Sequence, residues 1–218
     1  MLEVDNIELS FDGKKILWGI YLKAEKGKIT SILGRNGCGK TSLLQIIFGS
    51  LTPKYATIRI DKTYIKSPLY RHHPISFLPQ DALLPKNTSI IKAFEYYNVQ
   101  WPEFISIFPN FQQYKTYKVH QLSSGEIRIL ETYLILKKEG DIILLDEPFS
   151  FIAPVHIEKI KMLLLEEKEN KTILLTDHYY QEILAISDAI YMIQNGHSKP
   201  IADEEDLKNL GYLSFNPK

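Results

Sequence analysis

The fold of this chain follows from one stretch, Ile32–Leu44, which reads ILGRNGCGKTSLL. A short β-branched run that begins at Ile29 leads into it, and an apolar helical pattern follows from Lys40. Between them, Gly34 to Thr41 fits the pattern G-x-x-x-x-G-K-[ST], whose glycines let the backbone bend and turn its N–H groups toward phosphate oxygens. A strand, a glycine-rich loop and a helix in this order predict a phosphate site for a nucleotide.

The residues of this loop are therefore the predicted nucleotide ligands of a P-loop NTPase. Lys40 is expected to reach the β- and γ-phosphates, and the hydroxyl of Thr41 to ligate Mg²⁺. Cys38 is interpreted as a small residue that fits the loop. The alternative is a glycine-rich strand–helix turn that carries an exposed lysine. The predicted nucleotide-binding set is Gly34, Arg35, Asn36, Gly37, Cys38, Gly39, Lys40, Thr41 and Ser42.

Two buried strands end in polar residues that suit the same chemistry. In IILLDEP, Asp146 is expected to hold Mg²⁺, in part through water, and Glu147 to point toward the attacking water as general base. In ILLTDH, His178 follows a strand of the same sheet and is expected to orient that water. For the two carboxylates the alternative is a solvated loop start or the cap of the next helix. For His178 it is a helix-capping Asp177 followed by an incidental histidine.

A third strand, ISFLPQ, ends at Gln80, which is expected to ligate the metal or the water. A plain turn glutamine is the alternative. Further on, HQLSSGEIRILE has a capping-box spacing from Ser123 to Glu126, and a helix N-terminus is also an anion site. This stretch is either a well-capped helix start or a second phosphate site.

Apolar strands alternate with helices in the second half of the chain, which predicts a mostly parallel α/β sheet covered on both faces. The opening strands alternate apolar and polar residues and predict an antiparallel β subdomain beside it. The pattern breaks over residues 81–121, where a helical lobe is expected. We therefore predict one domain, 1–218, with a core of 1–80 and 122–218.

Composition excludes several classes of protein. Lys+Arg and Asp+Glu balance at 26 each, so a dedicated nucleic-acid binder is not expected. The lone Cys38 rules out an internal disulfide and fits a reducing compartment. The opening MLEVDNIELS lacks the apolar segment of a signal peptide, and no apolar run reaches the roughly 18 residues that span a bilayer. A cytoplasmic protein is predicted.

The order of motifs, GRNGCGKT, LPQ, LSSGE, ILLDEP and LLTDH, resembles the nucleotide-binding subunit of ATP-binding cassette (ABC) transporters. The resemblance covers nearly the whole chain and implies a RecA-like core, ATP and Mg²⁺ as ligands, and ATPase activity. It implies a head-to-tail dimer with an identical or different cassette, and a transmembrane permease subunit on whose cytoplasmic side the chain would sit. It also implies that Phe11 stacks on adenine, although Phe11 could be simple core. The residues that would bind the partner's ATP are Ser123, Ser124, Gly125 and Glu126.

Two departures from the family pattern stand out. Ser124-Gly125 replaces a common pair of glycines, and Ser150–Ala153 has alanine where an aspartate usually links the two sites of the dimer. The second departure keeps open a catalytically weak subunit that works beside a different cassette. The other alternative is a soluble ABC ATPase that acts on nucleic acid or the ribosome.

The lobe is rich in aromatic residues, which either form its core or include a docking surface for the membrane subunit. Tyr96 and Trp101 are the members expected to be exposed. The full set between 94 and 117 is Phe94, Tyr96, Tyr97, Trp101, Phe104, Phe108, Phe111, Tyr114 and Tyr117.

Overall fold

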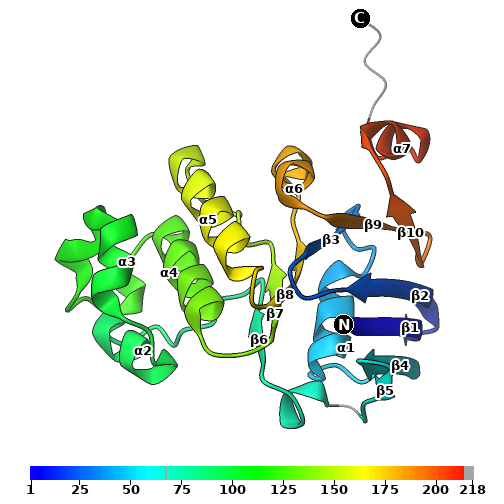
Figure 1. The fold of residues 1–218 in the computed structure, drawn as a ribbon, viewed down its shortest axis with the longest axis horizontal. Helices are drawn as coiled ribbons and strands as arrows, with labels where there is room; N and C mark the ends of the chain where they lie inside the picture. The colour runs from blue at the N-terminus through cyan, green and yellow to red at the C-terminus, as the bar shows by residue number, and fades with distance from the viewer. Residues whose placement is uncertain (67, 214–218) are drawn as a thin grey trace, which may run out of the picture.

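The computed structural model describes residues 1–66 and 68–213, and within them the chain forms two β-sheets and a set of helices (Figure 1). The larger sheet has six strands and is parallel except for one edge, where the last strand pairs antiparallel with its neighbour. In order across the sheet the strands are β10 (His197–Ile201), β9 (Ala189–Gln194), β3 (Ile29–Gly34), β8 (Thr172–Thr176), β7 (Ile142–Asp146) and β6 (Ile75–Leu78).

The smaller sheet is antiparallel and is built mainly from the start of the chain. Its order is β2 (Lys14–Ala24), β1 (Leu2–Phe11), β4 (Tyr55–Ile60) and β5 (Thr63–Tyr64). Asp12 and Gly13 join the first two strands, and both have positive φ, +47° and +78°. An Asp-Gly pair with positive φ gives the turn whose twist suits a two-residue hairpin. The predicted parallel core with an antiparallel subdomain is thus confirmed.

Helix α1 (Lys40–Phe48) lies between the two sheets, in one apolar core. Leu44 of the helix belongs to the same cluster as Val4 of β1 and Leu174 of β8. The neighbours of Leu174 in β8, Ile173 and Leu175, belong to the second core on the opposite face. Side chains alternate across a strand, so a fully apolar strand is what a sheet covered on both faces requires.

The opposite face of the larger sheet is covered by helices that run side by side in Figure 1. They are α4 (Ser124–Lys137), α5 (Pro154–Glu167) and α6 (Tyr180–Ile186), with the short α7 (Glu204–Asn209) near β10. Among the residues that the structure describes, no helix is both long enough and apolar enough to cross a membrane.

Between β6 and α4 the chain forms the helical end of the molecule, at the left of Figure 1. Its α-helices are α2 (Ile90–Tyr97) and α3 (Trp101–Ile107), with 3₁₀ turns at Pro109–Tyr114 and Val119–Gln121; another 3₁₀ turn, Leu69–Arg71, precedes β6. Phe104 is the centre of its core, with ring centroids 5.2 Å from Phe94, 5.0 Å from Phe111 and 4.9 Å from Tyr133 of α4. This cluster is therefore continuous with the helix layer of the main core.

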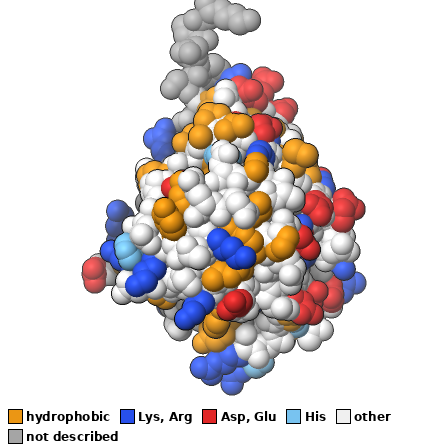
Figure 2. All heavy atoms as spheres, turned by 90° about the vertical axis from the view of Figure 1, so that its left-hand side faces the viewer, with side chains coloured by type: hydrophobic (Ala, Val, Ile, Leu, Met, Phe, Trp, Pro, Cys, Tyr) orange, Lys and Arg blue, Asp and Glu red, His pale blue; other side chains and the backbone are white. Residues whose placement is uncertain are grey.

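Most of the aromatic residues of this end are core. The expectation that Trp101 is exposed is wrong: it is 7% exposed, because it packs edge-on against Phe94. Tyr96, by contrast, is 86% exposed. Figure 2 views the molecule from this end, where hydrophobic side chains lie in separate patches broken by polar and charged groups.

Candidate active site

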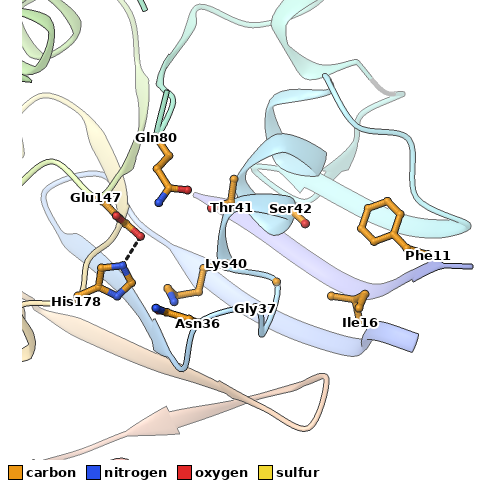
Figure 3. Close-up of a pocket in the computed structure, with 11 residues that line it drawn as sticks. Phe11, Ile16, Asn36, Gly37, Lys40, Thr41, Ser42, Gln80, Glu147 and His178 are labelled. Atoms are coloured by element: carbon orange, nitrogen blue, oxygen red, sulfur yellow. Dashed lines mark ion pairs between the residues drawn. The ribbon is translucent and has the colours of Figure 1, made fainter. Parts of the chain in front are cut away.

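Many of the residues predicted for the nucleotide site meet at one edge of the larger sheet. The loop after β3 leads into α1, and Glu147, His178 and Gln80 follow the carboxyl ends of β7, β8 and β6. Parallel strands bring their carboxyl ends to the same edge, which is where open α/β sheets bind ligands. There they surround a cavity of about 460 Å³ (Figure 3). Its lining is Phe11, Ile16, Asn36, Gly37, Gly39, Lys40, Thr41, Ser42, Gln80, Glu147 and His178.

The glycine-rich loop is held tightly against its surroundings. Gly39 has φ of +102°, and a Cβ there would lie 2.7 Å from the side chain of Leu17. The buried Lys40 bends back over the loop, and its Nζ donates to the carbonyl of Gly34 at 2.8 Å. The lysine charge is thus held against the backbone carbonyls of the loop, at the wall of the cavity.

Gly34, Arg35 and Cys38, which the sequence also assigned to the nucleotide, do not line this cavity among the described residues. Arg35 and Cys38 line a neighbouring cavity of about 380 Å³. Nη2 of Arg35 donates to the carbonyl of Gly211 at 2.8 Å, so this side chain points toward the end of the described chain. Burial raises the pKa of the Cys38 thiol, which disfavours the reactive thiolate.

Asp146 is completely buried at the end of β7. Its Oδ1 accepts a hydrogen bond from the hydroxyl of Thr176 at 2.7 Å, while Oδ2 has no partner among the described groups. Burial raises the pKa of this carboxyl, and the hydroxyl of Thr176 together with the nearby hydroxyl of Thr41 opposes that rise. A buried carboxylate oxygen without a donor, next to Thr41, fits the oxygen ligands that Mg²⁺ takes.

Among residues 1–66 and 68–213, no group of three or more His, Cys, Asp or Glu side chains forms a metal cage. Mg²⁺ does not need one, because in phosphate-transferring sites it uses one or two protein ligands, the phosphates and water. The donor set therefore fits an Mg²⁺ ion that also binds phosphate oxygens and water.

Glu147 adopts an uncommon backbone conformation, with φ of +56°. Non-glycine residues with positive φ are strained and are often found at functional sites. Its Oε1 lies 2.5 Å from Nε2 of His178 (Figure 3), and Ser150 donates to its Oε2 at 3.1 Å. The carboxylate is therefore held at the cavity wall from two sides.

Asp177 does more than cap the helix start that the sequence predicts. Its Oδ1 accepts from the backbone N–H of His178 at 2.7 Å and of Tyr179 at 3.1 Å. Its Oδ2 accepts from the N–H of Phe149 at 2.9 Å. The carboxylate thus ties the loop that carries His178 to the loop that carries Glu147.

The second predicted phosphate site lies apart from the first. None of the four described residues Ser123–Glu126 lines the nucleotide cavity, and Ser124 lines an adjacent cavity of about 530 Å³. The capping box is complete: the Ser123 hydroxyl accepts from the N–H of Glu126 at 3.3 Å, and Glu126 Oε2 accepts from the N–H of Ser123 at 2.8 Å. A Cβ on Gly125 would lie 2.4 Å from the carbonyl oxygen of Phe151, so glycine is required there by space.

Phe11 stands at the rim of the nucleotide cavity, beside Ile16 (Figure 3). It is 49% exposed, which rules out the alternative that it is a core residue. The residues that sequence reasoning missed are Arg128 and Glu131, two buried charges in α4. No sequence signal separates them from ordinary helix charges, because the groups they bind lie far away along the chain.

Comparison with known proteins gives consistent matches. The family model described as ABC transporter matches residues 17–150. An uncharacterized ABC transporter ATP-binding protein of Methanocaldococcus jannaschii is 27% identical over 224 residues, with 98% of this chain and 82% of that protein covered. A spermidine/putrescine import ATP-binding protein of Spiroplasma citri is 27% identical over 222 residues, and the match covers 96% of this chain but only 63% of that longer protein.

The fold agrees with these matches. A solved structure of a nucleotide-free ATP-binding cassette from an ABC transporter superposes with a TM-score of 0.80 at 23% identity, covering 98% of this chain and 96% of the other. The family match alone spans more than half of the chain. The chain therefore belongs to the ABC transporter family, as an ATP-binding subunit and an ATPase.

Proposed function

We propose that the cavity at the strand ends binds Mg²⁺-ATP and that the chain hydrolyses it in a head-to-tail dimer, to drive transport through a separate membrane subunit. The observation that carries the proposal is the meeting of Lys40, Gln80, Glu147 and His178 around one cavity with the glycine-rich loop. These groups supply the charge, the positioning and the base that phosphoryl transfer to water requires.

The nucleotide would be held from both ends. Phe11 is exposed at the rim and offers a face for the adenine ring; stacking of a base on an aromatic ring contributes about 1–3 kcal/mol. At the other end, Lys40 would leave the Gly34 carbonyl for the β- and γ-phosphates. The loop N–H groups from Asn36 to Ser42 would donate to the phosphate oxygens.

Thr41, Asp146 and Gln80 would hold the Mg²⁺ ion. The support is Oδ2 of Asp146, which has no partner among the described groups, the nearby hydroxyl of Thr41, and the position of Gln80 at the cavity wall. When bound, Mg²⁺ supplies positive charge that offsets the charge on the β- and γ-phosphate oxygens.

Glu147 would act as the general base. Its carboxylate is aimed at the cavity and is held by His178 and Ser150, so it meets the attacking water in a fixed direction. His178 is the more exposed member of the pair and would orient the same water or the γ-phosphate. General-base catalysis of this kind contributes about 10²–10⁴-fold to the rate.

The separation of the two proposed phosphate sites supports the dimer. Ser123, Ser124 and the start of α4 lie outside the chain's own nucleotide cavity, and both serines are exposed. Their N–H groups and the helix dipole would bind the γ-phosphate of ATP held by a second cassette. The complete capping box supports this role, because a rigid helix start is a preorganised anion site.

The first test is hydrolysis by the purified chain with Mg²⁺ and with EDTA, for wild type and Glu147→Gln. The variant should hydrolyse ATP about 10²–10⁴-fold more slowly. It should also elute as a dimer when ATP is present. Glu158→Gln, an exposed carboxylate on α5, is the matched control and should behave as wild type. Turnover at the wild-type rate by Glu147→Gln would refute the role of Glu147.

The membrane partner needs a second test. Tagged Glu147→Gln protein is purified with ATP from detergent-solubilised membranes of its own host. Co-purification of a polytopic membrane protein supports the transporter role and identifies the subunit that selects the cargo. Recovery of soluble dimer alone, or of nucleic acid, would instead favour a soluble ABC ATPase.

A further inference from the structure

Helix α4 carries two charged side chains in its buried part. Arg128 is 5% exposed and Glu131 is 1% exposed, and they lie one turn apart. Burial lowers the pKa of Arg128 and raises that of Glu131, and each group's charge opposes the shift of the other. Burying a charged group is unfavourable unless its hydrogen bonds are satisfied. The groups that Arg128 and Glu131 bind therefore show why two charges are buried in this helix.

The guanidinium of Arg128 donates to three backbone carbonyls. Its Nε donates to Glu147 O at 3.1 Å, its Nη1 to Pro79 O at 2.7 Å, and its Nη2 to Asp146 O. Two of these carbonyls belong to the residues proposed as metal ligand and general base, and the third immediately precedes Gln80. The planar fork of arginine can hold several acceptors in fixed directions, which lysine cannot do.

The carboxylate of Glu131 holds the same loop from its other end. Its Oε1 accepts from the N–H groups of Leu83 and Leu84, both at 2.8 Å. One turn of α4 therefore fixes the backbone at Pro79 and at Leu83–Leu84, with Gln80 on the segment between them. The loop needs side-chain acceptors because these N–H groups lie outside any strand or helix.

The two charges also line the cavity next to the nucleotide cavity. Arg128 and Glu131 line the cavity of about 530 Å³ whose wall includes Gln80 and Glu147, and these last two residues also line the nucleotide cavity. A displacement of this turn of α4 would therefore move groups on both sides of the nucleotide site. Ser124, where α4 begins, is about one helical turn away from Arg128.

We propose that Arg128 and Glu131 are positioning residues for ATP hydrolysis: together they hold the loop of Gln80 and the backbone of Asp146 and Glu147 in one rigid arrangement with the start of α4. The inference rests on the proposed function, because it assigns these two side chains to the support of that site. It also gives the start of α4 a physical connection to the base, so that a phosphate bound at Ser124 is coupled to the position of Glu147.

The test compares Arg128→Met, Glu131→Ala and Glu131→Gln with wild type. Turnover should fall about 10–100-fold in Arg128→Met and Glu131→Ala, the usual effect of removing a group that orients a metal ligand. ATP affinity measured in EDTA should be retained, because neither side chain touches the nucleotide cavity. Glu131→Gln should recover most of the activity, since its amide oxygen can accept from Leu83 and Leu84.

Lys171→Met is the control: it also removes a buried cation, but one that lies away from the site. Nζ of Lys171 also donates to backbone carbonyls, those of Leu136 in the last turn of α4 and of Lys138 just after it, at the far end of the helix. This variant should lose stability without losing turnover. If Arg128→Met does not fold, Arg128→Lys replaces it and should show a smaller loss of turnover, since one ammonium cannot bind all three carbonyls.

Hydrogen exchange provides a readout that does not depend on hydrolysis. The amides of Leu83 and Leu84 should exchange faster in Glu131→Ala and stay protected in Glu131→Gln and Lys171→Met. Absence of ATPase activity in wild type would refute the proposed function, and the exchange of this loop would then still decide the positioning role. Wild-type turnover in Arg128→Met, or a Glu131→Gln variant as impaired as Glu131→Ala, would overturn the inference.

Discussion

Oε1 of Glu147 and Nε2 of His178 lie 2.5 Å apart, although the two residues follow different strands of the parallel sheet. Their backbones are joined as well, because the carboxylate of Asp177 accepts N–H bonds from both loops. In this position the backbone of Glu147 is strained, with a positive φ. The pair therefore keeps the carboxylate of Glu147 in one orientation. We expect that substitution of either residue removes the same contribution to turnover.

His178→Ala should lower turnover on the order of 10²-fold, since a misplacement of a catalytic group by about 1 Å has an effect of this size. ATP binding in EDTA should persist, because the glycine-rich loop is unchanged. The measurement is steady-state ATPase activity of the single variant and of the double variant with Glu147→Gln. The double variant should be little worse than Glu147→Gln alone. If the fold loss of turnover in the double variant equals the product of the two single losses, the two residues act independently.

Asp146→Asn should raise the melting temperature of the nucleotide-free protein at pH 8. Folding raises the pKa of Asp146, so this carboxyl binds more protons in the folded than in the unfolded chain. Its contribution to stability is therefore fully present below the ordinary aspartate pKa of about 3.9 and is lost as the pH rises through the raised value. Asparagine does not titrate and can still accept from Thr176.

The measurement is thermal unfolding of both proteins from pH 4 to pH 8 in EDTA. The difference in melting temperature between Asp146→Asn and wild type should become smaller toward pH 4. The raised pKa values of Asp177 and Glu131 are common to both proteins and drop out of the difference. If the difference in melting temperature stays the same from pH 4 to pH 8, the titration of Asp146 is not its cause.

Gly125→Ala should destabilise the protein by about 1–3 kcal/mol, the usual effect of forcing a methyl group into a filled space. The new Cβ would meet the backbone oxygen of Phe151 at 2.4 Å, and backbone cannot swing aside as a side chain can. Ser124→Ala, at the exposed neighbouring position, should change stability by less than about 0.5 kcal/mol. Urea unfolding midpoints compare the two; equal midpoints would refute the close contact.

Phe104→Ala should cost about 3–5 kcal/mol of unfolding free energy, because its ring is fully buried at the centre of the aromatic cluster. Tyr96→Ala removes an aromatic ring that is 86% exposed and should stay within about 0.5 kcal/mol of wild type. The same denaturant titration measures both. A stable Phe104→Ala variant would show that the helical end does not depend on this core.

Sequence alone predicted the parts that depend on local pattern. The glycine-rich motif from Gly34 to Thr41 and the apolar strands before Asp146 and His178 were read from spacing, and parallel strands then bring their ends to one edge. Lys40, Gln80, Glu147 and His178 accordingly line one cavity, and Phe11, which only the family resemblance pointed to, lines it as well. The prediction that Trp101 is exposed is wrong, because the number of aromatic residues in a segment does not show which rings are buried against one another.

Only the tertiary structure decided which charges serve the site from inside. Arg128 and Glu131 read as ordinary charges in an amphipathic helix until their partners are known, and Glu131 is 48 residues from Leu83. The same holds for Asp177, whose bond to Phe149 spans 28 residues. The sequence by itself determined the strands, the phosphate loop and the strand-end residues, because these are local periodicities; the folded chain determined the buried partners, because hydrogen bonds between distant segments leave no local pattern.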